Sequence, residues 1–201
     1  MSQNWSPLSP AEVSSLFENV TAPWGFAGGY AIEMFLDDAF RPHDDIDIVI
    51  YRDDQSVFRD ALENWRVMAC DPPGQHRPWN IGEALPEHVH DIWCAKHPEE
   101  DWCLQIMLMD HDEKNWIYRR QRDICLPKDD IFMMTEQGDM YLKPEIQLLF
   151  KSKAPREKDE MDVSKTLPRL SDDARAWLHS ALRVCDPQHP WLNSVAQSQS
   201  R

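Results

Sequence analysis

Two aspartates, Asp45 and Asp47, stand at the start of an apolar run and have the spacing of a metal-binding pair. The run over residues 45–51 alternates acidic and apolar residues and then becomes fully apolar, which predicts a core strand. Side chains two apart on a strand point to the same side, about 6.5 Å apart, so both carboxylates can converge on a hard cation such as Mg²⁺. The alternative is an exposed strand end, where both carboxylates are solvated and bind nothing.

Two adjacent glycines, Gly28 and Gly29, precede this pair and have the properties of a phosphate-binding turn. They follow a short apolar stretch at 24–27 that predicts a buried strand, and apolar residues at helical spacing follow over 31–36. Glycines at such a junction bring bare backbone amides close to an anion, and the helix N-terminus adds a partial positive charge. A tight turn without a ligand is the alternative. Together, a phosphate site and a carboxylate pair on neighbouring strands would hold a nucleoside triphosphate and its activating metals.

The segment from Gly28 to Ile50 resembles the polymerase-β-like nucleotidyltransferase superfamily, in which a glycine pair, a helix and an acidic strand follow one another. More closely, it resembles the aminoglycoside adenylyltransferases that act on 2″-hydroxyls and their bacterial relatives. The shared features are the Gly-Gly-aromatic-Ala start, the Arg-x-His-x-Asp-h-Asp end (h, apolar) and the interval of fifteen residues, 30–44, between them. Residues 141–162 are similar to the C-terminal helical part of those relatives, so the resemblance covers most of the chain.

The resemblance implies roles for the residues that match its motifs. Gly28 and Gly29 would hold the β- and γ-phosphates of ATP, and Asp45 and Asp47 would ligate two Mg²⁺ ions as the catalytic pair. The superfamily takes a third carboxylate from a later strand, where this chain has Gln105. A glutamine offers an oxygen to a metal but cannot act as a general base.

The missing carboxylate has three alternative sources. They are Asp91 on the paired strand, Asp110 at the end of the strand that carries Gln105, and Glu145 at a helix start.

Basic residues complete the expected nucleotide site. Arg41 and His43 flank the acidic strand and are expected to contact the triphosphate, with neutralisation of the adjacent aspartates as the alternative for Arg41. Lys151 and Lys153 lie two apart on an expected helix and point in different directions. We therefore expect Lys151 to reach a phosphate, with a solvated helix end as the alternative.

The remaining pattern places these residues in an α/β (α+β) fold. A capped helix begins after Ser9, and the short link at 97–101 predicts an antiparallel pair of strands. Further strands are expected over 65–69, 91–95, 102–109, 116–118 and within 131–142, a loop over 71–79, helices over 55–64, 144–153, 156–167 and 172–184, and a frayed tail over 193–201. The resemblance implies a mixed sheet flanked by helices. The core would be residues 1–126, and residues 127–201 would be a C-terminal hairpin and helical portion packed on it, or part of one single domain.

Composition restricts the function classes. The 201 residues contain 35 acidic and 21 basic side chains, a net charge of −14, which argues against nonspecific binding of nucleic acid and suits a cationic or neutral partner. No stretch is long and apolar enough to cross a bilayer, and the first residues lack the features of a secretory signal. We therefore expect a cytoplasmic protein whose five cysteines are reduced thiols.

Together with these features, the resemblance implies a magnesium-dependent nucleotidyltransferase that moves AMP from ATP to a hydroxyl of a small acceptor, such as an aminoglycoside-like cationic molecule. It would bind no nucleic acid and no membrane, and the sequence predicts no particular oligomeric state. One alternative is a non-catalytic relative that only binds a nucleotide. Another is a protein-modifying transferase or toxin–antitoxin component whose acceptor is a side-chain hydroxyl. A metal-dependent glycosyltransferase would leave the glycine pair unexplained.

Overall fold

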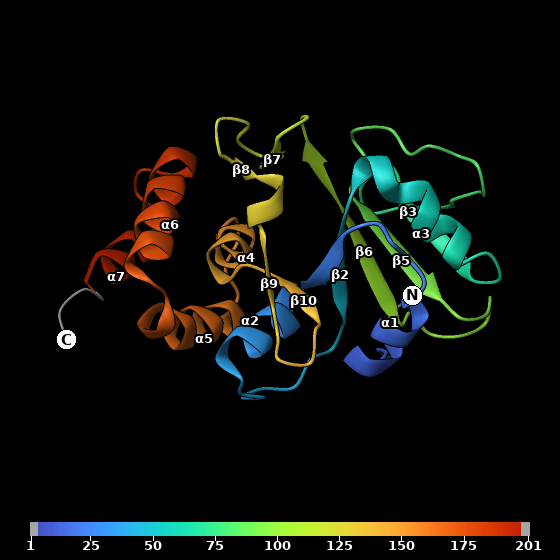
Figure 1. Cartoon of the computed structure of the whole chain (residues 1–201), viewed down its shortest axis with the longest axis horizontal. Helices are drawn as coiled ribbons and strands as arrows, with labels where there is room; N and C mark the ends of the chain where they lie inside the picture. Colours follow the sequence, from blue (N-terminus) through green and yellow to red (C-terminus); the bar gives the residue numbers. More distant parts are fainter. Residues whose placement is uncertain (1–3, 198–201) are drawn as a thin grey trace.

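A ten-stranded mixed β-sheet organises residues 4–197, the part of the chain that the computed structural model describes (Figure 1). The strands are β1 (Trp24–Ala27), β2 (Asp47–Tyr51), β3 (Arg66–Cys70), β4 (His76–Pro78), β5 (Asp91–Ala95), β6 (Leu104–His111), β7 (Asn115–Ile117), β8 (Cys125–Pro127), β9 (Phe132–Met134) and β10 (Met140–Leu142). Their order is β4-β3-β5-β6-β2-β1-β10-β9, with β7 and β8 continuing from β6. The β1–β10 and β2–β6 pairs are parallel, and the other pairs of these strands are antiparallel.

Helices pack around this sheet in two groups. They are α1 (Pro10–Leu16), α2 (Gly28–Leu36), α3 (Gln55–Ala61), α4 (Pro144–Lys151), α5 (Glu157–Thr166), α6 (Asp172–Cys185) and α7 (Trp191–Gln197). α1 and α3 lie beside β2, β3, β5 and β6, where the rings of Phe17 and Phe58 meet edge to face with centroids 5.3 Å apart (Figure 1). α4 to α7 gather at the other end of the molecule, and α4 packs against both α2 and α6.

β5 and β6 each have a buried face and a partly exposed face. Ile92 on β5 and Ile106 on β6 are fully buried, whereas Trp93 and Gln105 on the same strands are only partly buried. Successive side chains of a strand point to opposite faces, so Trp93 and Gln105, which are register partners, share the less covered face. Asp47 on β2 is in register with Gln105 and continues this row.

Several elements form as their sequence signals predict. Ser9 caps α1 in a reciprocal capping box with Glu12, and Ser171 caps α6 by accepting a hydrogen bond from the backbone of Ala174. β5 and β6 form the predicted antiparallel pair. The α/β class, with a mixed sheet, flanking helices and C-terminal helices, is confirmed.

Two predictions about strands are wrong. β2 begins at Asp47, so Asp45 lies just before the strand instead of within it. β4 lies within the stretch 71–79 that was expected to be a loop, where it pairs with β3 at the edge of the sheet. An edge strand tolerates a proline such as Pro78, because one side of its backbone needs no partner strand.

The C-terminal end also differs from the prediction. Residues 193–197 of the expected frayed tail belong to α7, which the buried side chains of Trp191 and Val195 anchor to the core, and residues 198–201 lie outside the described residues. The β9–β10 hairpin pairs with β1 and so shares the sheet of the N-terminal residues, while the division between 126 and 127 stays a prediction.

The composition led to expectations about membrane-spanning segments and about the cysteines. Over 4–197, no helix has the length and apolar character that a membrane span requires. All five cysteines are free, and Cys94 and Cys103 are buried core residues.

Candidate active site

The junction of β1 and α2 lies directly against the acidic strand. Gly28 has a φ of +64°, and a Cβ at this position would collide with Oδ2 of Asp47. Its backbone N–H donates a hydrogen bond to Oε1 of Gln147 on α4 at 2.8 Å. Both the left-handed backbone and the close approach of Asp47 require glycine here. The turn therefore brings α2, α4 and β2 together at one point.

A cavity of about 400 Å³ opens at this point between the sheet and the C-terminal helices. Gly28, Asp45 and Asp47 line it, so the structure brings together these three predicted site residues. Burial, and then the charges of Asp45 and Asp91, raise the pKa of Asp47 to about 7, and Lys151 opposes the shift. A cation that binds beside this carboxylate would therefore stabilise its ionised form.

Gln105 also lines the cavity and is bound to one of the candidate acids. Its Nε2 donates a hydrogen bond to Oδ1 of Asp91 on β5 at 3.1 Å. Asp110 lines the cavity as well, but its Oδ1 lies 2.9 Å from the guanidinium of Arg52. Glu145 is buried at the start of α4, outside the cavity lining, and burial raises its pKa. Asp91 is thus the candidate acid that directly contacts Gln105.

Arg41 and His43 do not line the cavity. The guanidinium of Arg41 binds both oxygens of Asp162 on α5, with Nε 2.7 Å from Oδ1 and Nη2 2.9 Å from Oδ2. His43 places Nε2 2.8 Å from Oε1 of Glu33 and Nδ1 3.0 Å from Nη1 of Arg41. A Cβ on Gly29 would collide with the His43 ring and approach Nη2 of Arg41 to 2.6 Å. Gly29 is therefore needed for this packing, while a contact of Arg41 or His43 with a nucleotide stays a prediction.

Lys151 lines the cavity but already has two acidic partners. Its Nζ lies 3.0 Å from Oδ1 of Asp159 and 2.9 Å from Oδ2 of Asp162, and its side chain is only 7% exposed. Lys153 lines the cavity too, although its spacing from Lys151 suggested that only one of the two lysines would reach the site.

Three arginines of the cavity were not identified from the sequence: Arg119, Arg120 and Arg156. Arg120 donates hydrogen bonds to the hydroxyl of Tyr118 and the carbonyl of Phe150, and burial and Arg120 lower the pKa of Arg119. The rings of Tyr118 and Phe150 stack with centroids 5.8 Å apart and form an apolar wall. An arginine pair directly after an apolar strand in an acidic chain is the signal that could have identified them.

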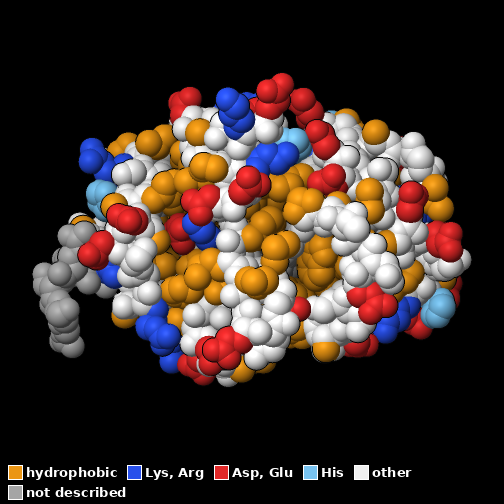
Figure 2. All heavy atoms as spheres, in the orientation of Figure 1, with side chains coloured by type: hydrophobic (Ala, Val, Ile, Leu, Met, Phe, Trp, Pro, Cys, Tyr) orange, Lys and Arg blue, Asp and Glu red, His pale blue; other side chains and the backbone are white. Residues whose placement is uncertain are grey.

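The cavity lining balances five basic side chains against five acidic ones, in a chain that is strongly acidic as a whole: Arg119, Arg120, Lys151, Lys153 and Arg156 against Asp45, Asp47, Asp91, Asp110 and Asp159. On the face drawn in Figure 2, acidic side chains are spread widely and do not gather in one patch. Across residues 4–197, no group of three or more histidine, cysteine, aspartate and glutamate side chains is placed to hold a metal ion. Asp45, Asp47 and Gln105 all line the cavity, and carboxylate and amide oxygens are ligands that Mg²⁺ prefers.

Comparisons with known proteins agree with this fold. A family model described as aminoglycoside-2''-adenylyltransferase matches residues 11–78, and no curated protein matches the chain. The lincosamide antibiotic adenylyltransferase LnuA, solved with lincomycin bound, is 19% identical with a TM-score of 0.55, over 80% of this chain and 97% of LnuA. The antibiotic-resistance factor ANT(2'')-Ia in complex with adenylyl-2''-tobramycin is 12% identical with a TM-score of 0.56, over 85% of this chain and 93% of its own. A solution structure of ANT(2'')-Ia is 14% identical with a TM-score of 0.56, over 86% and 88% of the two chains.

The chain has the nucleotidyltransferase fold, and the resemblance to that superfamily is confirmed. The matched segment 11–78 contains Gly28, Asp45 and Asp47, which line the cavity, and also Gly29, which does not.

Proposed function

We propose that the chain is a Mg²⁺-dependent nucleotidyltransferase that moves AMP from ATP to a hydroxyl of a small acceptor. The observation that carries this proposal is the meeting of Gly28, Asp45 and Asp47 in one cavity that arginine and lysine side chains also line. A divalent cation bound by the two carboxylates would neutralise phosphate charge and activate the acceptor oxygen. The raised pKa of Asp47 supports such a cation, because it reflects burial of the carboxylate and, after that, the negative charges of Asp45 and Asp91.

The cations of the cavity suit the phosphates of ATP. Arg119 and Lys153 line it, and among the described residues neither forms an ion pair within 4.0 Å. Charged donors without a protein partner are available to an anionic ligand. Lys151 also brings a positive charge to the cavity wall, but this charge is already paired with the carboxylates of Asp159 and Asp162. The stacked rings of Tyr118 and Phe150 offer an apolar surface to the nucleobase.

Asp91 is our candidate for the base that accepts the proton of the acceptor hydroxyl. It lies in the cavity beside Gln105, whose amide holds one carboxylate oxygen and leaves the other free to accept. A neighbouring strand would thus supply the acid that the glutamine cannot. The acceptor would lie on the side of Asp91 and Gln105, with the departing pyrophosphate roughly in line on the far side of the phosphorus.

Pyrophosphate release tests the proposal. The purified protein is incubated with Mg²⁺, each of the four nucleoside triphosphates in turn, and tobramycin or lincomycin, the acceptors named for the structural relatives. We expect ATP-dependent release that needs an acceptor, stops on chelation of the metal and is absent in Asp47→Asn. Adenylylated acceptor is identified by its added mass. Release that persists in Asp47→Asn would place the reaction at another site.

A non-catalytic nucleotide-binding protein is the second candidate, and Gln105 in place of a carboxylate is the observation that favours it. Such a protein would show ATP-dependent thermal stabilisation without pyrophosphate release. A transferase that modifies proteins would instead transfer label from ATP to a protein in a lysate.

A further inference from the structure

Asp162 on α5 is a fully buried carboxylate that binds two cations from distant parts of the chain. Its side chain has no exposed surface, and Arg41, 121 residues earlier, binds both of its oxygens at 2.7 and 2.9 Å. Oδ2 also lies 2.9 Å from Nζ of Lys151 on α4. A buried carboxylate is tolerated only when it is fully paired, so both cations are held firmly in place.

The two cations reach two different parts of the candidate active site. Lys151 lines the cavity itself. Arg41 and the adjacent His43 occupy the space beside the Cα of Gly29, at the turn whose other glycine faces Asp47. Asp162 does not line the cavity, but one of its two cations, Lys151, does, and the other, Arg41, packs against the glycine turn beside it.

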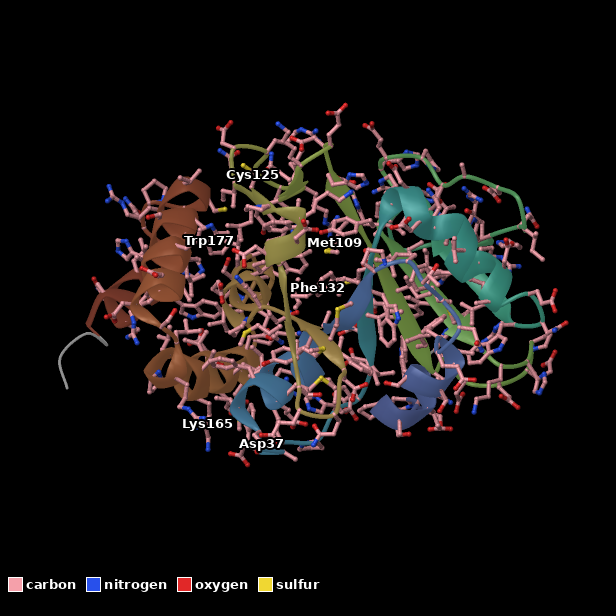
Figure 3. The ribbon with its side chains drawn as sticks, viewed as in Figure 1. Asp37, Met109, Cys125, Phe132, Lys165 and Trp177 are labelled. Atoms are coloured by element: carbon pink, nitrogen blue, oxygen red, sulfur yellow. The ribbon has the colours of Figure 1, made fainter. Side chains whose placement is uncertain are left out.

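The helix that carries Asp162 is docked on the glycine helix by contacts of its own. α5 lies beside α2 in Figure 1, and Figure 3 shows Lys165 of α5 and Asp37 at the end of α2 close together at the lower edge. Nζ of Lys165 lies 3.8 Å from Oδ2 of Asp38 and 5.6 Å from the centre of the Phe40 ring. These contacts join α5 to the end of α2 without involving Asp162.

Asp159 cannot replace Asp162 in this arrangement. Its two oxygens are shared between Lys151 and Arg156, and no contact joins it to Arg41. Loss of the Asp162 charge would therefore leave Arg41 buried without a carboxylate partner and Lys151 held by one partner instead of two.

We propose that Asp162 is a positioning residue for nucleotide binding. It fixes the Lys151 ammonium at the cavity wall and the Arg41 guanidinium against the glycine turn, so that the C-terminal helical portion is part of the nucleotide site. The proposal rests on the proposed function for the identity of the nucleotide. The contact between Asp162 and Lys151 does not depend on it.

The test compares Asp162→Asn with Glu145→Gln. Glu145 is the matched control, because it is a buried acid of α4 outside the cavity. Calorimetric titration of ATP with Mg²⁺ is expected to show affinity at least about tenfold weaker in Asp162→Asn, the effect of disturbing a hydrogen bond to a charged group. Both variants are expected to lose thermal stability, but Glu145→Gln should keep the ATP affinity of the wild type.

A second readout follows the lysine directly. Lys151 is 7% exposed and Lys165 53% exposed, so an amine-acylating reagent is expected to label Lys165 fast and Lys151 slowly in the wild type. Asp162→Asn should raise the labelling of Lys151 several-fold relative to Lys165, measured on peptides by mass spectrometry. In a double-mutant cycle on ATP affinity, Lys151→Gln should cost much less in the Asp162→Asn background than in the wild type.

The outcomes separate the two proposals. Unchanged ATP affinity and unchanged labelling of Lys151 in folded Asp162→Asn would overturn the positioning role. A wild type that binds no ATP would overturn the proposed function, and the labelling of Lys151 would then decide alone whether Asp162 holds this lysine. If Asp162→Asn does not fold, Asp162→Glu keeps the buried charge but displaces it by one methylene group. It should weaken ATP binding and expose Lys151, whereas Glu145→Asp should do neither.

Discussion

Gly28 and Asp47 fit together so closely that any side chain on Gly28 would occupy the position of the Asp47 carboxylate. The glycine is the first residue of α2 and has a left-handed backbone conformation, and the aspartate opens β2, the strand paired with β1. One contact thus connects the predicted phosphate turn with the predicted metal ligand. The carboxylate of Asp47 thus fills the space that a side chain on residue 28 would need.

Gly28→Ala should therefore destabilise the protein and displace Asp47. The left-handed backbone alone costs a residue with a Cβ about 1–2 kcal/mol, and the collision with Asp47 adds to this cost. Urea unfolding measures the total. Gly74→Ala is the matched control, because Gly74 has a φ of +85° but no atom near its Cβ position. Equal losses in the two variants would show that the contact with Asp47 is unimportant.

Asp47→Asn should be more stable than the wild type at neutral and higher pH when no metal is present. The pKa of Asp47 is raised from 3.8 to about 7 in the folded protein, chiefly by burial. The folded state therefore binds a proton more tightly than the unfolded state, and wild-type stability falls as the pH rises from about 4 to about 7. We expect the stability difference between the variant and the wild type to grow over this range and then level off.

Mg²⁺ should reverse this difference. A cation beside Asp47 stabilises the ionised carboxylate, so millimolar Mg²⁺ should raise the melting temperature of the wild type but hardly that of Asp47→Asn. Denaturation followed at several pH values with and without Mg²⁺ measures both effects. A difference that does not vary with pH would contradict the raised pKa.

Gln105→Asp should make the stability of the protein more dependent on Mg²⁺. The change removes the hydrogen bond from Gln105 to Asp91 and adds a carboxylate in register with Asp47. Without metal, three acids then repel one another and the melting temperature should fall, whereas Mg²⁺ should restore it. Gln105→Asn is the control, because it shortens the side chain by the same methylene group but adds no charge. The same Mg²⁺ response in both variants would show that position 105 does not face the cation.

Asp91→Asn should lower the rate of transfer without weakening the binding of ATP. If Asp91 accepts the proton of the acceptor hydroxyl, kcat should fall by about 10²-fold or more while the KM for ATP stays unchanged. Asp110→Asn serves as the comparison, because Asp110 lines the same cavity but is paired with Arg52. Equal losses of kcat in the two variants would indicate a general effect of charge in the cavity.

The sequence determined the local elements of the site. The capping box of Ser9 and Glu12 and the junction of strand and helix at Gly28 depend on residues a few positions apart, whose conformations local sterics and hydrogen bonds restrict. The spacing of Asp45 and Asp47 likewise identified the metal-binding candidates, although only Asp47 lies within the strand.

The tertiary structure alone decided which side chains act together. Aspartates close to Arg41 in the sequence were its expected alternative partners, but Arg41 binds Asp162. That carboxylate is buried where water cannot solvate either charge. Asp91 contacts Gln105 because of the register between β5 and β6, and this register is fixed by the pairing of the whole strands. Arg119 reached the cavity through the turn after β7, a short strand that pairs with the far end of β6. Such contacts join residues far apart in the chain, and no local spacing encodes them.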